Sequence, residues 1–373
     1  MKKLLFYTYW KFDDAETNGI TQKIISQKKA FEQLGYNVDL TYLLNDDYYI
    51  DMDGKKIVIQ KNPPFITKPL AEEKLKKIVK HREYDCAYFR YNCSDSRFIS
   101  LLKCLKKNGT KVYIEIPTVE YDKELSETFL GKMFLAVDRM NRWKLKSYVD
   151  RMVVFQDYDE VFDTKTIRTY NGIDVDRIPV KKPTEESETI NIISVALYQS
   201  WHGLERILLG LSDYYKKTTN RKIMLHVVGD GVALPGYKSL VKELNLDKYV
   251  VFYGLKSGRE LDSIFDKCDI AVEVLGGHKK GTTISSSIKS REYIARGIPY
   301  ISEIKTDVLP EDNDYVIRVS YDDDPIDMNQ VVDYYNSHLA SKNQKEKVIM
   351  DMRELAQDKI DMKSTMRVVV DTF

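Results

Sequence analysis

The chain reads SSSIKSREYIARGIP over residues 285–299, where three serines lead into a short helical pattern and a following strand begins at Pro299. Serine is favoured at the start of a helix, where the first backbone N–H groups have no partner within the helix. The helix dipole also places its positive end there. Hydroxyls and N–H groups in this arrangement predict a binding site for an anion such as a diphosphate.

Two charged side chains add to this predicted anion-binding site. Lys289, in the first turn, puts a cation where an acid is preferred, which costs stability unless an anion binds. Glu292 lies one turn further along, where its carboxylate can accept both hydrogen bonds of a ribose diol. In the structural alternative, a serine simply caps the helix, and Lys289 and Glu292 form a solvated pair that contributes about a few tenths of a kcal/mol.

Outside this stretch, short apolar runs alternate with amphipathic ones, as a parallel sheet with crossover helices requires. A polar segment at 181–189 separates two such series and is typical of a linker. The predicted strands cover 3–10, 38–42, 84–91, 111–116 and 152–155 in the first series, and 190–196, 223–228, 250–253, 270–274 and 299–302 in the second. The predicted helices cover 20–34, 204–216, 237–244, 259–267 and 288–295, the fourth starting at a capping box formed by Ser257 and Glu260.

We therefore expect an α/β protein with two doubly wound domains, over residues 1–175 and 176–355. The tail is helical by composition from residue 345 to 366. A C-terminal helix within 356–373 is predicted to pack back on the first domain as a brace. Open parallel sheets bind ligands at the carboxyl ends of their strands, so the site should lie in the loops there.

Composition limits the possible partners. Lys and Arg total 58 against 57 Asp and Glu, and a net charge of +1 predicts no nucleic-acid partner. The four cysteines show no CxxC spacing, so we expect core thiols in a reducing cytoplasm rather than a disulfide framework or a zinc site. The apolar run at 4–10 is shorter than the roughly 20 residues of a membrane span, so a cytoplasmic protein is predicted.

The pattern S-x-K-x-x-E-Y-x-A-x-G-x-P, starting at Ser287, closely resembles the donor-binding motif of GT-B glycosyltransferases of family four. The resemblance extends over most of the chain: it includes a glycine before the first helix, Asn171-Gly172-Ile173-Asp174, Val228-Gly229-Asp230-Gly231 and Phe252-Tyr253-Gly254. It implies two facing Rossmann-like domains and transfer of a hexosyl group with retention of configuration. The donor would be a nucleotide-diphosphate sugar, with a UDP-sugar expected, and no metal or other cofactor would be needed.

The resemblance also implies roles for individual residues. Glu292 matches the ribose-binding glutamate of the family, and Gly254 and Leu255 match the loop beside the base. Gly19 matches the N-domain glycine that lets the backbone approach the leaving phosphate and the donor sugar. The phosphate contacts of the family match Lys289 and the backbone of Ser286 and Ser287.

The sequence departs from the family pattern in two places. Many members have an arginine and a lysine after the first strand of the second domain, but residues 200–205 read SWHGLE. His202 in this stretch is our candidate for stabilising the leaving group together with Lys289, or for sensing phosphate protonation. Ile284 occupies the place of the first of two family glutamates, and Lys280, in the glycine-rich loop 276–281, is a candidate to neutralise phosphate instead.

The acceptor is expected on the first domain. The loop 117–122 offers hydroxyl and carboxyl groups from Thr118, Glu120 and Tyr121, and Tyr91-Asn92 follows a neighbouring strand. The alternative for this loop is a Pro-containing turn whose polar groups face water. The basic and apolar segment 131–151 is either an ordinary amphipathic helix or a peripheral contact with an anionic membrane that carries a lipid-linked acceptor.

Three functions stay open at this stage. The first is an active transferase that builds a surface polysaccharide or a related glycan. The second is a non-catalytic partner subunit that keeps the fold, motivated by the missing first glutamate. The third is a sugar-nucleotide epimerase of similar architecture, for which the sequence shows no converging acid and base carboxylates.

Overall fold

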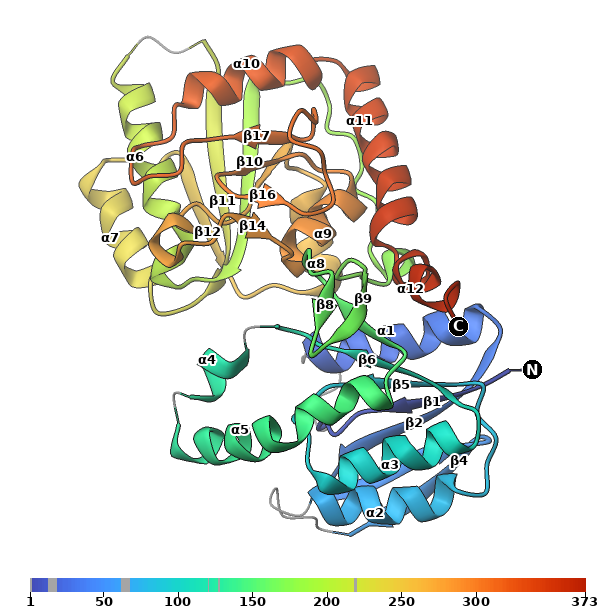
Figure 1. Cartoon of the computed structure of the whole chain (residues 1–373). Helices are drawn as coiled ribbons and strands as arrows, with labels where there is room; N and C mark the ends of the chain where they lie inside the picture. Colours follow the sequence, from blue (N-terminus) through green and yellow to red (C-terminus); the bar gives the residue numbers. More distant parts are fainter. Residues whose placement is uncertain (1, 13–18, 62–67, 120, 127, 218–219) are drawn as a thin grey trace. The chain divides into compact units, whose positions relative to one another are not determined.

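The computed structural model describes residues 2–12, 19–61, 68–119, 121–126, 128–217 and 220–373. It divides into two compact units, Met1–Gly172 with Met362–Phe373, and Ile173–Asp361. Each unit is built on a mainly parallel sheet flanked by helices, so the predicted α/β class is confirmed (Figure 1).

The first unit contains, within the described ranges, a nine-stranded sheet in the order β4-β3-β2-β1-β5-β6-β7-β9-β8. The strands from β2 to β9 in this order run parallel, and β3, β4 and β8 pair antiparallel at the edges. Their bounds are β1 Lys2–Tyr7, β2 Tyr36–Leu44, β3 Asp47–Met52, β4 Lys55–Gln60, β5 Cys86–Arg90, β6 Lys111–Glu115, β7 Arg151–Val154, β8 Glu160–Val161 and β9 Thr164–Arg168.

The β3–β4 hairpin was not predicted from the sequence. Its turn consists of Asp53 and Gly54, with φ values of 51° and 75°. Positive φ at both central residues is the signature of the turn that matches the twist of two antiparallel strands, and Asp-Gly is a preferred pair for it. The Asp-Gly pair was therefore the signal that could have identified the hairpin.

The helices of the first unit are α1 Gly19–Gln33, α2 Lys68–Val79, α3 Ser96–Lys107, α4 Tyr121–Leu125, α5 Phe129–Asn141 and α12 Met362–Val370. The segment 131–151 is helical only in part, because α5 ends in the 3-10 turn η2 Arg142–Ser147. The predicted C-terminal brace is confirmed, since α12 packs on α1 (Figure 1). The Thr169 hydroxyl donates to the Thr365 carbonyl at 2.8 Å, and Phe373 stacks on Phe31.

The second unit is wound on a parallel sheet in the order β12-β11-β10-β13-β15-β17. The strands are β10 Thr189–Leu197, β11 Lys222–Asp230, β12 Val250–Gly254, β13 Ile270–Val272, β15 Tyr300–Ser302 and β17 Val316–Arg318, with a small separate pair, β14 Ile284–Ser285 and β16 Lys305–Thr306. The helices are α6 Leu204–Tyr215, α7 Leu234–Glu243, α8 Gly258–Phe265, α9 Ile288–Arg296, α10 Met328–His338 and α11 Lys342–Leu355.

Two local predictions in this unit were wrong. Ser257 is the N-cap residue of α8, so the predicted helix start is correct, but the capping box is not formed: the Ser257 side chain makes no capping bond, and Glu260 pairs with Lys256 at 2.9 Å instead of reaching back. The polar segment 181–189 is no free linker, since it lies inside the second unit, where Lys345 donates to the Thr184 hydroxyl at 2.7 Å. No helix in the described part of the chain combines the length and apolarity needed to cross a bilayer.

Candidate functional site

The N-terminus of α9 is built as the sequence predicted, and its cap is occupied. Ser287 is the N-cap residue, and its hydroxyl oxygen accepts the Ser290 N–H at 3.0 Å. The same hydroxyl donates to the Glu273 carboxylate at 2.7 Å. The helix ends at Gly297, whose φ of 75° suits glycine. Ser287 therefore caps the helix, as the structural alternative predicted, and the start of the helix is still exposed.

Lys289 lies in the first turn of α9 and is half-buried. Its ammonium makes no hydrogen bond and no ion pair within the described ranges. Burial lowers the pKa of Lys289, and the nearby Glu273 carboxylate only partly opposes that shift. A half-buried cation without an ion pair at the positive end of a helix is unfavourable unless an anion binds there.

The loop after β10 places His202 at this site. It forms the 3-10 turn η4 Ser200–His202, which ends at Gly203. The Leu275 N–H donates to the His202 carbonyl at 3.0 Å, so the loops after β10 and β13 are joined. Gly203 has a φ of 67°, and a Cβ there would lie 2.4 Å from the carbonyl carbon of Leu275. Only glycine allows this close approach.

The protonation of His202 follows from its contacts. Its Nδ1 accepts the backbone N–H of Gln199 at 2.9 Å, so in the neutral ring the proton is on Nε2. Burial, followed by the charges of Lys289 and Lys280, lowers the pKa of His202 to about 4. At neutral pH the ring is therefore uncharged, and its Nε2–H can donate to an anionic ligand. A role in sensing phosphate protonation near neutral pH is not supported by this pKa.

Lys280 also reaches this cluster, from the loop that follows β13. Its ammonium lies 3.3 Å from the ring centroid of Trp201, a cation–π contact. His278 in the same loop bridges Glu303 at 2.9 Å and Asp323 at 3.0 Å. The charges of Lys289 and Lys280 both act on His202, so the structure brings together three residues that the sequence analysis proposed for the phosphates.

Glu273 is a site residue that the sequence analysis missed. It directly follows β13, is only 2% exposed, and accepts hydrogen bonds from the Val274 N–H at 2.7 Å and from the hydroxyls of Ser285 and Ser287. The available signal was an acid directly after a buried apolar strand, at the sheet edge where ligands bind. Glu273 links the end of β13 to the start of α9.

Glu292 does not form the surface pair with Lys289 that the structural alternative required. Its carboxylate instead accepts from Arg296, with Nε at 3.0 Å. Gly254 and Leu255 lie at the carboxyl end of β12, separated from β10 by β11. Leu255 is 65% exposed, and a Cβ at Gly254 would meet open space. Leu255 therefore offers an exposed apolar side chain against which the planar ring of a ligand could pack.

The predicted donor and acceptor residues of the first unit differ in their exposure and in their hydrogen bonds. Gly19 begins α1, and Thr118 is exposed after β6. Glu120 lies outside the described residues. The Tyr121 hydroxyl donates to the buried Asp138 at 2.6 Å and accepts from Arg142 at 3.1 Å, so it helps to hold the fold. Of the three predicted acceptor residues, Thr118 is therefore the one that the structure shows exposed.

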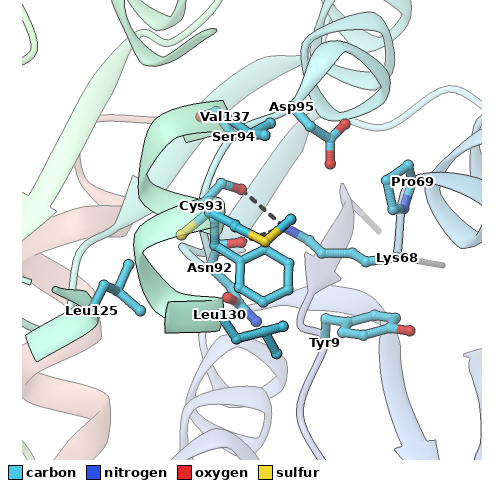
Figure 2. Close-up of a pocket in the computed structure, with 12 residues that line it drawn as sticks. Tyr9, Lys68, Pro69, Asn92, Cys93, Ser94, Asp95, Leu125, Leu130 and Val137 are labelled. Carbon is cyan, nitrogen blue, oxygen red and sulfur yellow. Dashed lines mark hydrogen bonds between the residues drawn. The ribbon is translucent and has the colours of Figure 1, made fainter. Parts of the chain in front are cut away.

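A pocket of about 340 Å³ lies in the first unit, and Figure 2 shows its lining. Its polar side comes from the loop after β5 and the start of α2, including Asn92, Cys93 and Lys68. Its apolar side comes from Tyr9, Leu125 and α5. In the described part of the chain, no group of three His, Cys, Asp or Glu side chains could hold a metal ion.

The two doubly wound units and the brace helix define the GT-B glycosyltransferase fold. Solved structures of this class match the whole chain, at low sequence identity. A glycosyltransferase from Rickettsia africae has 15% identity and a TM-score of 0.62, and covers 100% of this chain and 97% of its own.

Two further structures extend this comparison. HepE from Anabaena, solved in complex with UDP, has 11% identity and a TM-score of 0.60, covering 100% of this chain and 99% of its own. Sucrose-phosphate synthase from Thermosynechococcus elongatus has 14% identity and a TM-score of 0.58, covering 100% and 99%. No protein-family model and no curated protein matches the sequence.

Proposed function

We propose that this chain is a retaining glycosyltransferase that moves a sugar from a nucleotide-diphosphate donor, a UDP-sugar, to a glycan or lipid-linked acceptor. One observation carries the proposal: Lys289 is half-buried at the start of α9 without an ion-pair partner in the described structure, and its charge adds to burial in lowering the pKa of His202, whose neutral ring carries its proton on Nε2. Such a set of donors is complementary to a diphosphate. The choice of UDP is supported by HepE, whose similar fold was solved with UDP.

The proposed chemistry uses charge rather than a protein nucleophile. The bond between the anomeric carbon and the donor phosphate breaks, and a bond from the acceptor oxygen forms on the same face of the sugar. Lys289 and the Nε2–H of His202 stabilise the charge on the departing diphosphate, and Lys280 adds a second cation. An oxygen of that diphosphate accepts the proton of the acceptor hydroxyl.

We infer the remaining donor contacts from the resemblance of the sequence to glycosyltransferases of family four. Backbone N–H groups near Ser286 and Ser287 face the phosphates, and Leu255 packs beside the base. Gly19 lets the backbone approach the donor sugar. Glu292 binds the ribose diol and gives up part of its hydrogen bonding to Arg296 when it does so. Arg296 then still has Asp262 as a partner at 2.8 Å.

The pathway and location are part of the proposal. We place the reaction in the synthesis of a surface polysaccharide, in the cytoplasm and at the inner face of the membrane. The segment 131–151 supplies the peripheral contact, because it combines cations with exposed apolar side chains such as Trp143 and Met140.

A second candidate function is a partner subunit that binds nucleotide without catalysis. It is favoured by Ile284, which is 60% exposed in β14 at the place of the first family glutamate. An isoleucine cannot accept a hydrogen bond from a donor sugar. Sugar selection in an active enzyme must then depend on other residues.

Thermal unfolding with nucleoside diphosphates tests the proposal. UDP or a UDP-sugar should raise the melting temperature, because a ligand that binds only the folded state stabilises it. Glu292→Ala should abolish this shift, whereas Glu260→Ala, at the exposed start of α8, should leave it unchanged. The donor site is refuted if no nucleoside diphosphate shifts the melting temperature.

Turnover separates the two candidates. The purified protein is incubated with the UDP-sugar that stabilises it, with and without an acceptor library, and free UDP is measured. Release of UDP supports the transferase. Binding without release across an adequate acceptor screen would instead support the partner subunit.

A further inference from the structure

The loop that follows β13 carries three consecutive basic residues, and two of them have acidic partners. His278 is bound by two carboxylates, and Lys279 pairs with Glu205 at 2.6 Å. Lys280 is exposed and makes no ion pair in the part of the chain that the structure describes. Its ammonium lies instead over the indole of Trp201, 3.3 Å from the ring centroid.

This contact orients the Lys280 ammonium without neutralising it. A cation over an aromatic face is attracted by the ring, and tryptophan is the strongest of these rings. The contact restrains a flexible four-carbon side chain. An ammonium has three N–H donors, so those directed away from the indole stay available to an anionic ligand.

The Trp201 indole is itself held in place. Trp201 is half-buried in η4, and its ring stacks on that of His202 at 22°, with the centroids 6.1 Å apart. Gly276 belongs to the loop that carries Lys280, and a Cβ there would lie 2.8 Å from the Trp201 carbonyl oxygen. The two loops that supply the ring and the cation therefore pack directly against each other.

The loop of Lys280 is also anchored to α6, the helix that follows Trp201. The Glu303 carboxylate accepts the backbone N–H of His278 at 3.0 Å. The same carboxylate pairs with Arg206 of α6 at 2.6 Å, and both of these side chains are fully buried. The fold therefore sets the approach of Lys280 to the indole.

The indole and the ammonium border the proposed phosphate site. Burial, followed by the charges of Lys289 and Lys280, lowers the pKa of His202, which stacks on Trp201. Two cations thus act on one neutral imidazole. An anion that binds at this imidazole is attracted by both of them.

We propose that Trp201 is a positioning residue of the donor site, whose indole holds the Lys280 ammonium ready for the diphosphate and keeps it there in the complex. This inference rests on the proposed function. The gain is entropic, since a lysine that is already oriented loses less rotamer freedom when the ligand binds. Trp201 then raises donor affinity through Lys280 rather than through a contact of its own.

A double-mutant cycle tests this role, with UDP affinity measured by isothermal titration calorimetry on the full chain. Trp201→Leu should weaken UDP roughly two- to tenfold, the cost of ordering one long side chain on binding. Trp201→Phe keeps a ring face under the ammonium and should lose less. In the Lys280→Met background, Trp201→Leu should cause no further loss, because the side chain that it positions is gone.

The matched background is Lys279→Met, which removes a neighbouring lysine that is already paired with Glu205. Trp201→Leu should weaken UDP there by the same factor as in the unchanged chain. A loss from Trp201→Leu that persists in the Lys280→Met background would overturn the inference. Trp201 would then act through His202 or through the fold.

Tryptophan fluorescence without UDP checks the contact while Trp201 is kept. The chain has three tryptophans, and Lys280→Met should change the emission, because it removes a charge from one indole face. The same substitution should change nothing in the Trp201→Leu background, and Lys279→Met should change nothing in either. Identical spectra for Lys280→Met and the unchanged chain would show that the contact does not form, and would overturn the inference even if Trp201→Leu fails to fold.

Failure of this inference is distinguishable from failure of the proposed function. If UDP binds the unchanged chain but the effects of Trp201→Leu and Lys280→Met are additive, the donor site stands and the positioning role is wrong. If UDP does not bind the unchanged chain, the donor site is refuted and the positioning role with it.

Discussion

Glu273 accepts a hydrogen bond of 2.7 Å from the hydroxyl of Ser287, the residue that caps α9. The bond joins the carboxyl end of β13 to the N-terminus of the proposed phosphate-binding helix. The Glu273 carboxylate also opposes the effect of burial on the pKa of Lys289. One buried acid therefore both positions the helix start and influences its cation.

Removal of that acid should loosen the site. Glu273→Ala leaves the hydroxyls of Ser285 and Ser287 and the Val274 N–H without their acceptor. We expect the free energy of unfolding to fall by about 1–3 kcal/mol, the usual cost of unsatisfied buried groups. Urea unfolding measures this cost. Glu311→Ala, which removes an exposed partner of Lys305, serves as the matched control and should change little.

Lys289→Met should separate binding from stability. The substitution removes a half-buried cation that has no ion pair in the described structure, so the melting temperature without ligand should stay the same or rise. UDP affinity should fall roughly 10- to 150-fold, the loss of one hydrogen bond to a charged group.

The control for this change is Lys279→Met, because Lys279 is already paired with Glu205 at 2.6 Å and Asp323 at 3.1 Å. It should leave UDP affinity nearly unchanged. Equal losses of UDP affinity in the two lysine variants would argue against a specific role for Lys289.

The stability contributed by His278 should depend on pH. Burial would lower the pKa of His278, but its hydrogen bonds to Glu303 and Asp323 outweigh burial and raise that pKa above 6.5. Because the folded pKa is raised, the stabilisation is fully present below the unfolded value and is lost as pH rises through the folded pKa.

His278→Gln should therefore cost more stability at about pH 6 than at about pH 9, as measured by urea unfolding across that range. His81→Gln, at an exposed position after α2, provides the comparison and should change the stability little. A cost for His278→Gln that is constant with pH would contradict the charged bridge.

Arg206→Met should strongly destabilise the second unit. Arg206 and Glu303 have fully buried side chains that pair at 2.6 Å, and Arg206 also donates to the Leu275 carbonyl at 2.9 Å. Loss of the arginine leaves a buried carboxylate whose remaining partner, among the described residues, is His278, at a cost of about 3–5 kcal/mol. Chemical denaturation gives the value. The double variant with Glu303→Gln should recover part of the loss.

Much of the fold was predictable from local patterns in the sequence. The alternation of apolar runs predicted ten strands, and the structure has a strand at each of those places. The edge hairpin was missed although its strands have six residues each, because its Asp53-Gly54 turn signal was not used. The capping box at Ser257 failed because Lys256 competes for Glu260, which local pattern rules do not weigh.

The sequence by itself determined the helix α9 with its serines, Lys289 and Glu292, since capping and helical spacing are local properties. The sequence also proposed His202 and Lys280 as partners of this helix, but only the tertiary structure decided that they lie near it and that Glu273 joins them. His202, Glu273 and Lys280 meet Lys289 because parallel strands bring their carboxyl ends to one edge of the sheet, whatever their separation in the chain. The lowered pKa values of His202 and Lys289 likewise come from burial, which exists only once the sheet has formed.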